Sequence, residues 1–82
     1  MAKFMDVHNG FVGVTQKQFE EAHARDLALE GPEGVHFERA WLDPVSGKAF
    51  CISTGPNKEA VERVHKAAGH GTGEIYEIPV EV

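Results

Sequence analysis

The order of helix-like and strand-like segments constrains the fold of this chain more than any other feature. A helix is predicted from Thr15, where Gln18 completes a capping box, to a stop at Gly31-Pro32. A second helix is predicted from about Asn57 to Ala68. Strands are predicted for segments that alternate or are rich in β-formers, at residues 3–8, 35–42, 48–54 and 74–82.

The resulting order, β-α-β-β-α-β, is the ferredoxin-like arrangement, an α+β fold. Residues 43–47, Asp-Pro-Val-Ser-Gly, have the composition of a hairpin turn between the two middle strands. Right-handed crossovers then give an antiparallel sheet of order 4-1-3-2 with both helices on one face. Pro79 agrees with the edge position of the last strand. We expect one domain over residues 1–82, and a core this small favours a homodimer.

The amino-acid composition limits the classes of molecule that this chain is expected to bind. Eight Lys+Arg against thirteen Asp+Glu give a net charge of −5, which disfavours nucleic acid and suits cations. The single cysteine, Cys51, rules out an internal disulfide, and there is no CxxC pair. No apolar run has membrane-spanning length, and the opening residues contain no apolar signal core, so we expect no membrane partner and a cytoplasmic location.

Strand alternation divides the side chains between the face under the helices and the open face. The large apolar residues are assigned to the helix-covered core, namely Met5, Val7, Val35, Phe37, Trp41, Phe50, Ile52, Tyr76, Ile78 and Val80. The open face is then predicted to collect imidazole, carboxylate and thiol groups, from Asp6, His8, His36, Glu38, Cys51 and Glu77. This mixture indicates chemistry, although a solvated polar face with a chance excess of histidine would look the same.

Imidazole nitrogen and carboxylate oxygen are ligands for borderline divalent metals such as nickel, zinc, copper and cobalt. Shared-face spacing occurs at His36/Glu38 on a strand and at His23/Asp26 on a helix. His70 lies in a glycine-rich loop. The predicted metal ligands are His8, His36, Glu38, His23, Asp26 and His70. His65, on the apolar stripe of the second helix, is interpreted either as a buried structural residue or as a cap on its own helix.

Two alternatives remain open at this level. One is a small-molecule-binding or cofactor-free enzyme domain that uses the open sheet face as a pocket, with Asp6 or His8 as base. Cys51 is a poor candidate nucleophile because no helix N-terminus lies there to lower the pKa of its thiol. The other alternative is an interaction module without a ligand, whose histidines are dispersed.

Five segments carry a resemblance to a known family: KFMDVH (3–8), VHFERAWLDP (35–44), FCISTGP (50–56), EAVERVHKAAGH (59–70) and EIYEIPV (74–80). Together they resemble small bacterial proteins long catalogued as a domain of unknown function, in particular a nickel-binding subgroup. The resemblance implies a ferredoxin-like dimer that binds Ni²⁺ on its surface for sequestration or detoxification, without catalysis. Nickel as the metal rests on this resemblance. Surface sites of this kind also predict bridging between dimers, so excess metal is expected to cause higher association.

Overall fold

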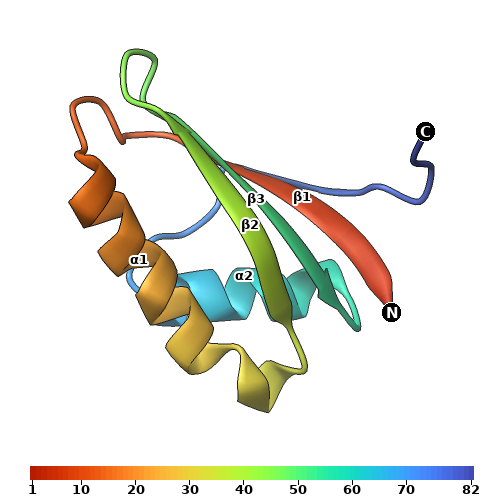
Figure 1. Ribbon diagram of the computed structural model, residues 1–82. Helices are drawn as coiled ribbons and strands as arrows, with labels where there is room; N and C mark the ends of the chain where they lie inside the picture. Colours follow the sequence, from red (N-terminus) through yellow and green to blue (C-terminus); the bar gives the residue numbers. More distant parts are fainter.

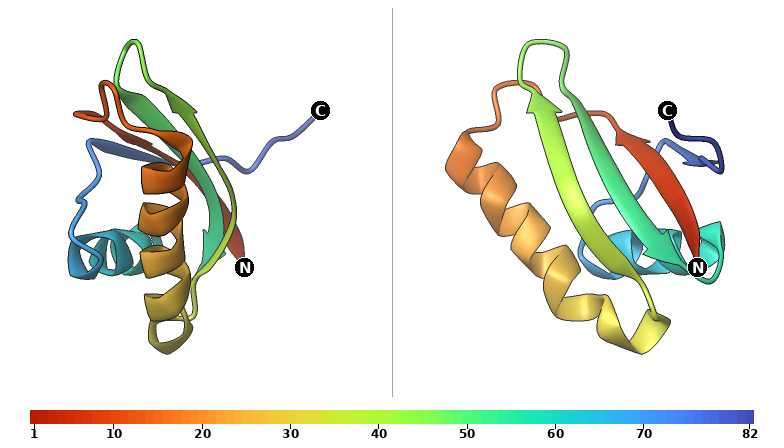
Figure 2. Two further views of the ribbon diagram at one scale, coloured as in Figure 1. Left: turned by 60° about the vertical axis from the view of Figure 1, so that its left-hand side comes forward. Right: turned by 45° about the vertical axis from the view of Figure 1, so that its right-hand side comes forward.

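A four-stranded antiparallel sheet is covered on one face by two helices in the computed structural model, which describes residues 1–82 (Figure 1). The strands are β1 (Ala2–His8), β2 (His36–Asp43), β3 (Lys48–Gly55) and β4 (Glu74–Glu77), and the helices are α1 (Gln16–Leu29) and α2 (Lys58–Ala67). The sheet order is β2-β3-β1-β4, which is the predicted 4-1-3-2 order read from the other edge. Figure 2 shows both helices on the same side of the sheet. The ferredoxin-like α+β fold is confirmed.

Local signals place both helices where the sequence predicts them. Thr15 and Gln18 form the reciprocal capping box at the start of α1. At the start of α2, the side chain of Asn57 accepts a hydrogen bond of 2.9 Å from the backbone N–H of Ala60. After α1 the chain makes one short 3₁₀ turn, Gly31–Glu33. Gly69 adopts a φ of +93° directly after α2, which a residue with a side chain would resist.

The predicted assignment of faces is wrong for β1, β3 and β4. The side chains that point toward the helices are Phe4, Asp6, His8, Ala49, Cys51, Ser53 and Ile75. Their apolar neighbours in sequence, Met5, Val7, Phe50, Ile52 and Tyr76, lie on the open face. Ala49 and Ser53 are small buried residues on this face, and among its polar groups Asp6 contacts His65 of α2 while His8 bonds to the loop carbonyl of Gly71. The open face is therefore the apolar one.

In β2 the predicted alternation is correct only at its start. Phe37 is buried as predicted, but the register shifts between Phe37 and Arg39, so Glu38 occupies a bulge. Beyond the bulge the faces exchange, and Ala40 turns toward the helices. Trp41, predicted to be in the core, is 48% exposed and pairs across the open face with Phe50.

The apolar core is small and lies at one end of the space between sheet and helices. Its buried members are Phe4, Val35, Phe37, Ala60, Val61 and Val64. β4 is shorter than predicted: after Glu77, the backbone N–H of Ile78 donates to the carbonyl of Lys3, and the last residues project away from the sheet (Figure 2). No helix is long and apolar enough to cross a membrane.

Candidate metal centre

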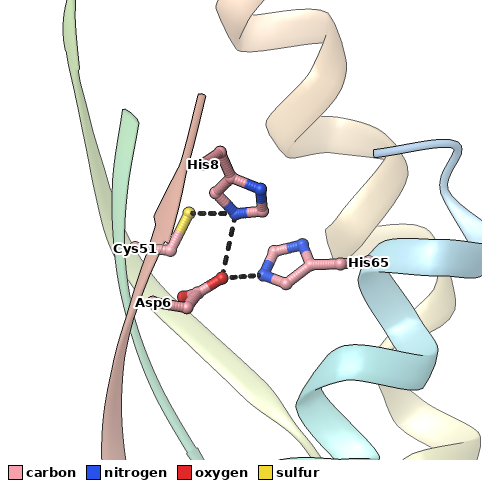
Figure 3. Close-up of side chains that lie close together, drawn as sticks. All are labelled: Asp6, His8, Cys51 and His65. Atoms are coloured by element: carbon pink, nitrogen blue, oxygen red, sulfur yellow. Dashed lines mark hydrogen bonds and ion pairs between the residues drawn. The ribbon is translucent and has the colours of Figure 1, made fainter. Parts of the chain in front are cut away.

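Four buried donor groups converge between the sheet and α2, and they are called the inner group: Asp6, His8, Cys51 and His65. Asp6 and His8 come from β1, Cys51 from the neighbouring β3, and His65 from α2, as Figure 3 shows. Oδ2 of Asp6 lies 2.9 Å from Nε2 of His8 and 2.6 Å from Nε2 of His65. Sγ of Cys51 lies 3.8 Å from the same nitrogen of His8.

The carboxylate of Asp6 is the least conventional feature of the inner group. Its side chain is fully buried, and neither oxygen has a partner in hydrogen-bonding geometry. Nε2 of His65 is close to Oδ2, but it is likewise without a hydrogen bond, so the attraction between them is one of charge and not of a directed bond. Buried polar atoms are ordinarily hydrogen-bonded. The four convergent donors could hold a metal ion.

A second set of donors, the outer group, consists of Asp26 on α1, His65 on α2 and His70 in the loop after α2. Oδ1 of Asp26 accepts from Nδ1 of His65 at 3.0 Å and from Nε2 of His70 at 2.9 Å. The side chain of His70 is 12% exposed, whereas those of Asp26 and His65 are almost completely buried. His70 is therefore the point at which this cluster meets the solvent.

His65 belongs to both groups because its two ring nitrogens face opposite carboxylates. Burial by itself lowers the pKa of an imidazole, but the adjacent Asp26 and Asp6 outweigh this effect and raise the pKa of His65 to about 9. The ring is thus an imidazolium at neutral pH when no metal is bound. Burial also opposes the ionisation of Asp6 and Asp26, yet the neighbouring histidines hold the pKa of each carboxyl below its usual value.

The loop after α2 fixes the remaining ring. Nδ1 of His8 donates to the carbonyl oxygen of Gly71 at 3.1 Å, which turns Nε2 toward Asp6 and Cys51. The backbone N–H of Gly73 donates to the carbonyl of Val7 and holds the loop against β1. For Cys51, burial first and the nearby aspartates second raise the pKa of the thiol, so it is protonated at neutral pH.

The structure brings together three of the six predicted ligands, His8, Asp26 and His70. His23 points toward the same region and lines a cavity beside His8, but it belongs to neither group. The remaining two lie elsewhere. His36 is exposed, with Nδ1 3.4 Å from Oε1 of Glu30, and Glu38 forms an ion pair with Lys3 at 3.7 Å.

Sequence reasoning missed the inner group as a unit, although it singled out Asp6, His8 and Cys51 as neighbours in space. It placed them on the open face, where His65 cannot reach them. The signal that could have corrected this was His65 itself, because a histidine on the apolar stripe of a helix needs a buried polar partner. Asp6 and His8 are two residues apart in a strand, so their side chains point to the same face of the sheet. They can supply the polar partner of His65 only if that face is the one covered by the helices.

The fold and the donor set define a ferredoxin-like protein with a buried cluster of histidine, carboxylate and thiol groups suited to a late transition metal. A family model described as "Nickel responsive protein SCO4226-like" matches residues 4–78, and the chain belongs to this family. It is also similar to a solved structure, reported as a crystal structure analysis of SCO4226 from Streptomyces coelicolor A3(2). The two are 54% identical with a TM-score of 0.97, over 99% of this chain and 100% of that one. A comparison with curated proteins finds no match.

Proposed function

We propose that this protein binds Ni²⁺ for sequestration or detoxification and that it is not an enzyme. The observation that carries the proposal is the convergence of buried imidazole and carboxylate donors, with Asp6 between His8 and His65 at its centre. The nickel-responsive family supports nickel as the metal. Nitrogen and oxygen donors of this kind also bind copper at least as tightly, so selectivity for nickel would depend on metal supply as well as on the site.

Access to the cluster supports binding and release from one side. His70 is the only partly exposed donor of the two groups, and the glycines of residues 69–73 surround it. An ion would meet Asp26 and His70 first. Neutral imidazoles supply nitrogen and the carboxylate offsets the charge of the ion. The free Cys51 thiol suits a reducing compartment such as the cytoplasm.

The alternative function, a small-molecule-binding or enzyme pocket on the open sheet face, required Asp6 or His8 as its base. Asp6 and His8 lie on the covered face, and the cavity beside His8 has a volume of only about 10 Å³. Such a space holds about one water molecule. This favours ion binding over the binding of an organic substrate.

Isothermal titration with Ni²⁺ tests the proposal. Asp26→Asn is expected to weaken binding at least about tenfold, because the charged donor nearest to the solvent is lost. His70→Ala should have an effect in the same direction. His36→Ala is the matched control: it removes an exposed imidazole outside the cluster and should leave the affinity unchanged. If His36→Ala weakens binding and Asp26→Asn does not, the metal lies on the surface of β2 and the buried centre is wrong.

We also propose that the protein is a homodimer that pairs through its open sheet faces. The apolar side chains that the helices leave uncovered are Met5, Val7, Trp41, Phe50, Ile52 and Tyr76. A second copy would supply the cover that a sheet with an apolar face requires. The projecting end of the chain, with Val80 and Val82 exposed, adds apolar surface for the same contact.

Trp41→Asp is expected to convert the dimer to a monomer, because a carboxylate on the paired face would be buried without a partner. Light scattering coupled to gel filtration gives the mass directly. Val45→Asp, on the exposed β2–β3 turn, is the control and should leave the mass unchanged. A parent protein of monomer mass at micromolar concentration would contradict the proposal.

A further inference from the structure

The strand β2 lies at one edge of the sheet and leaves part of its backbone unpaired. The register of the strands directs the N–H and C=O groups of Ala40 and Leu42 away from β3, toward this free edge. At the start of β2 the outward N–H of Phe37 donates to Oε2 of Glu30 at 2.8 Å. Ala40 and Leu42 have no such partner in the chain. Unpaired backbone groups of this kind are a template for a further strand.

An apolar groove lies between this free edge and α1. Its volume is about 460 Å³, and its apolar lining consists of Val14, Phe19, Ala40, Trp41 and Leu42. Arg39 is exposed at the same edge. Arg63 and the lysines Lys3 and Lys66 pair with carboxylates of their own chain, whereas Arg39 does not. A segment that fits this edge would carry an apolar side chain next to an acidic one.

The last residues of the sequence, 79–82, have this composition and are called the arm. They belong to no strand, they are exposed, and Figure 2 shows them leaving the sheet on the side away from the helices. In an extended segment, Val80 and Glu81 point to opposite faces. The only ion pair of the arm within its own chain joins Glu81 to Lys3 at 3.4 Å, on the surface, where such a pair contributes little.

We propose that the arm of each copy crosses to the partner subunit and pairs with the free edge of its β2 as an added strand. This inference rests on the homodimer proposed above, and it names the segment and the edge that complete the contact. Antiparallel pairing with Val80 opposite Ala40 places the side chain of Val80 over the groove. The same register places Glu81 opposite Arg39, on the other face. Pro79, which has no N–H, then turns its backbone nitrogen to the solvent.

The proposed contact between open sheet faces brings the arm to this edge. The arm follows β4, and β4 and β2 are the two outer strands of the sheet. A two-fold axis that runs along the strands, between the facing sheets, sets the β4 edge of one copy opposite the β2 edge of the other. Facing sheets lie about 10 Å apart, and four extended residues span about 13 Å. The arm is therefore long enough to reach the partner without unpairing β4.

Disulfide formation between two differently tagged proteins tests the pairing. One carries Arg39→Cys and the other Glu81→Cys, both with Cys51→Ser to remove the native thiol. In this register the two positions form a non-hydrogen-bonded pair, whose Cα atoms lie about 4.5 Å apart, within the range of a disulfide. After subunit exchange and mild oxidation, a mixed disulfide is expected on a non-reducing denaturing gel. Val45→Cys in place of Arg39→Cys, on the exposed β2–β3 turn, is the control and should give little product.

Two kinds of variant measure how much the arm contributes to association. Deleting residues 79–82 is expected to raise the dissociation constant of the dimer at least about tenfold, because the burial of a valine is lost. Arg39→Glu should also weaken association, and adding Glu81→Arg should restore it, since the pair is rebuilt with its charges exchanged. Sedimentation equilibrium gives the constants. Circular dichroism checks folding, and the charge variants keep the full chain in case the shortened one does not fold.

The possible outcomes separate this inference from the proposals on which it rests. A mixed disulfide together with weaker association of the shortened chain supports the exchange of arms. A dimer that keeps its affinity after the deletion and forms no mixed disulfide overturns the exchange but leaves the homodimer intact. Equal cross-linking to Val45→Cys also overturns it, because the arm then has no fixed position. A parent protein of monomer mass removes the homodimer and the exchange together, while the metal-binding proposal stands.

Discussion

Replacing His65 with glutamine is expected to destabilise the metal-free protein by about 3–5 kcal/mol, the largest effect predicted for a single substitution. The change leaves Asp6 and Asp26 buried without the positive charge that now lies between them. Urea unfolding of chelator-treated protein measures the loss. Lys66→Ala, the next residue on α2, is the control; its side chain is exposed and makes only a surface ion pair, so a change below about 1 kcal/mol is expected.

A rescue variant distinguishes the loss of charge balance from the loss of packing. In the His65→Gln background, Asp6→Asn removes one of the unpaired carboxylates and should recover part of the lost stability. In the parent protein the same Asp6→Asn should be destabilising, because it removes a partner of the imidazolium. If Asp6→Asn lowers stability equally in both backgrounds, His65 and Asp6 are not coupled, and the interpretation of their contact as a charge interaction is wrong.

The stability of the metal-free protein is expected to fall as the pH rises from 7 to 10. The pKa of His65 is raised from 6.5 to about 9 in the folded chain, so folding favours the protonated ring. The stabilisation is complete below the unfolded pKa of about 6.5 and disappears as the pH passes through about 9. A shift of this size corresponds to at most about 3 kcal/mol, at 1.36 kcal/mol per pKa unit.

Urea unfolding at several pH values, with a chelator present throughout, gives this dependence. The stability of His65→Gln should change much less with pH over the same range. This comparison distinguishes the contribution of His65 from that of other groups that titrate at high pH. At acid pH the stability is expected to change with pH in the opposite direction. The pKa values of Asp6 and Asp26 are lowered by folding, so the stability that they contribute is present above their unfolded values and lost as the pH falls through the folded ones. A parent protein equally stable at pH 7 and 10 would contradict the assignment of an imidazolium.

The fold could be predicted from the sequence because its signals are local. The Thr15/Gln18 capping box, the Asn57 cap and the stop at Gly69 lie within a few residues of the boundaries that they set. The hairpin turn fixes the pairing of β2 with β3 in the same way. Strand order then follows from general rules of chain connection, with no information from distant residues.

The faces of the strands could not be predicted in this way. Alternation shows which residues share a face, but it does not show which of the two faces is covered. The usual criterion, hydrophobicity, assigned Met5 and Val7 to the core in place of Asp6 and His8. It failed because Asp26 and His65, from distant parts of the chain, make the burial of polar groups favourable. In β2 the bulge at Glu38 also exchanges the two faces of the strand, and no pattern in the neighbouring residues predicts it.

The donors of the cluster are distributed along nearly the whole chain, from Asp6 in the first strand to His70 in the last loop. No fragment that ends before His70 contains both groups. During synthesis on a ribosome, the cluster would therefore be complete only after α2 and its loop have emerged and packed against the sheet. Long-range contacts of this kind form late in folding. Under the proposed function, tight metal binding would then be confined to complete chains, because a shorter chain lacks part of the cluster.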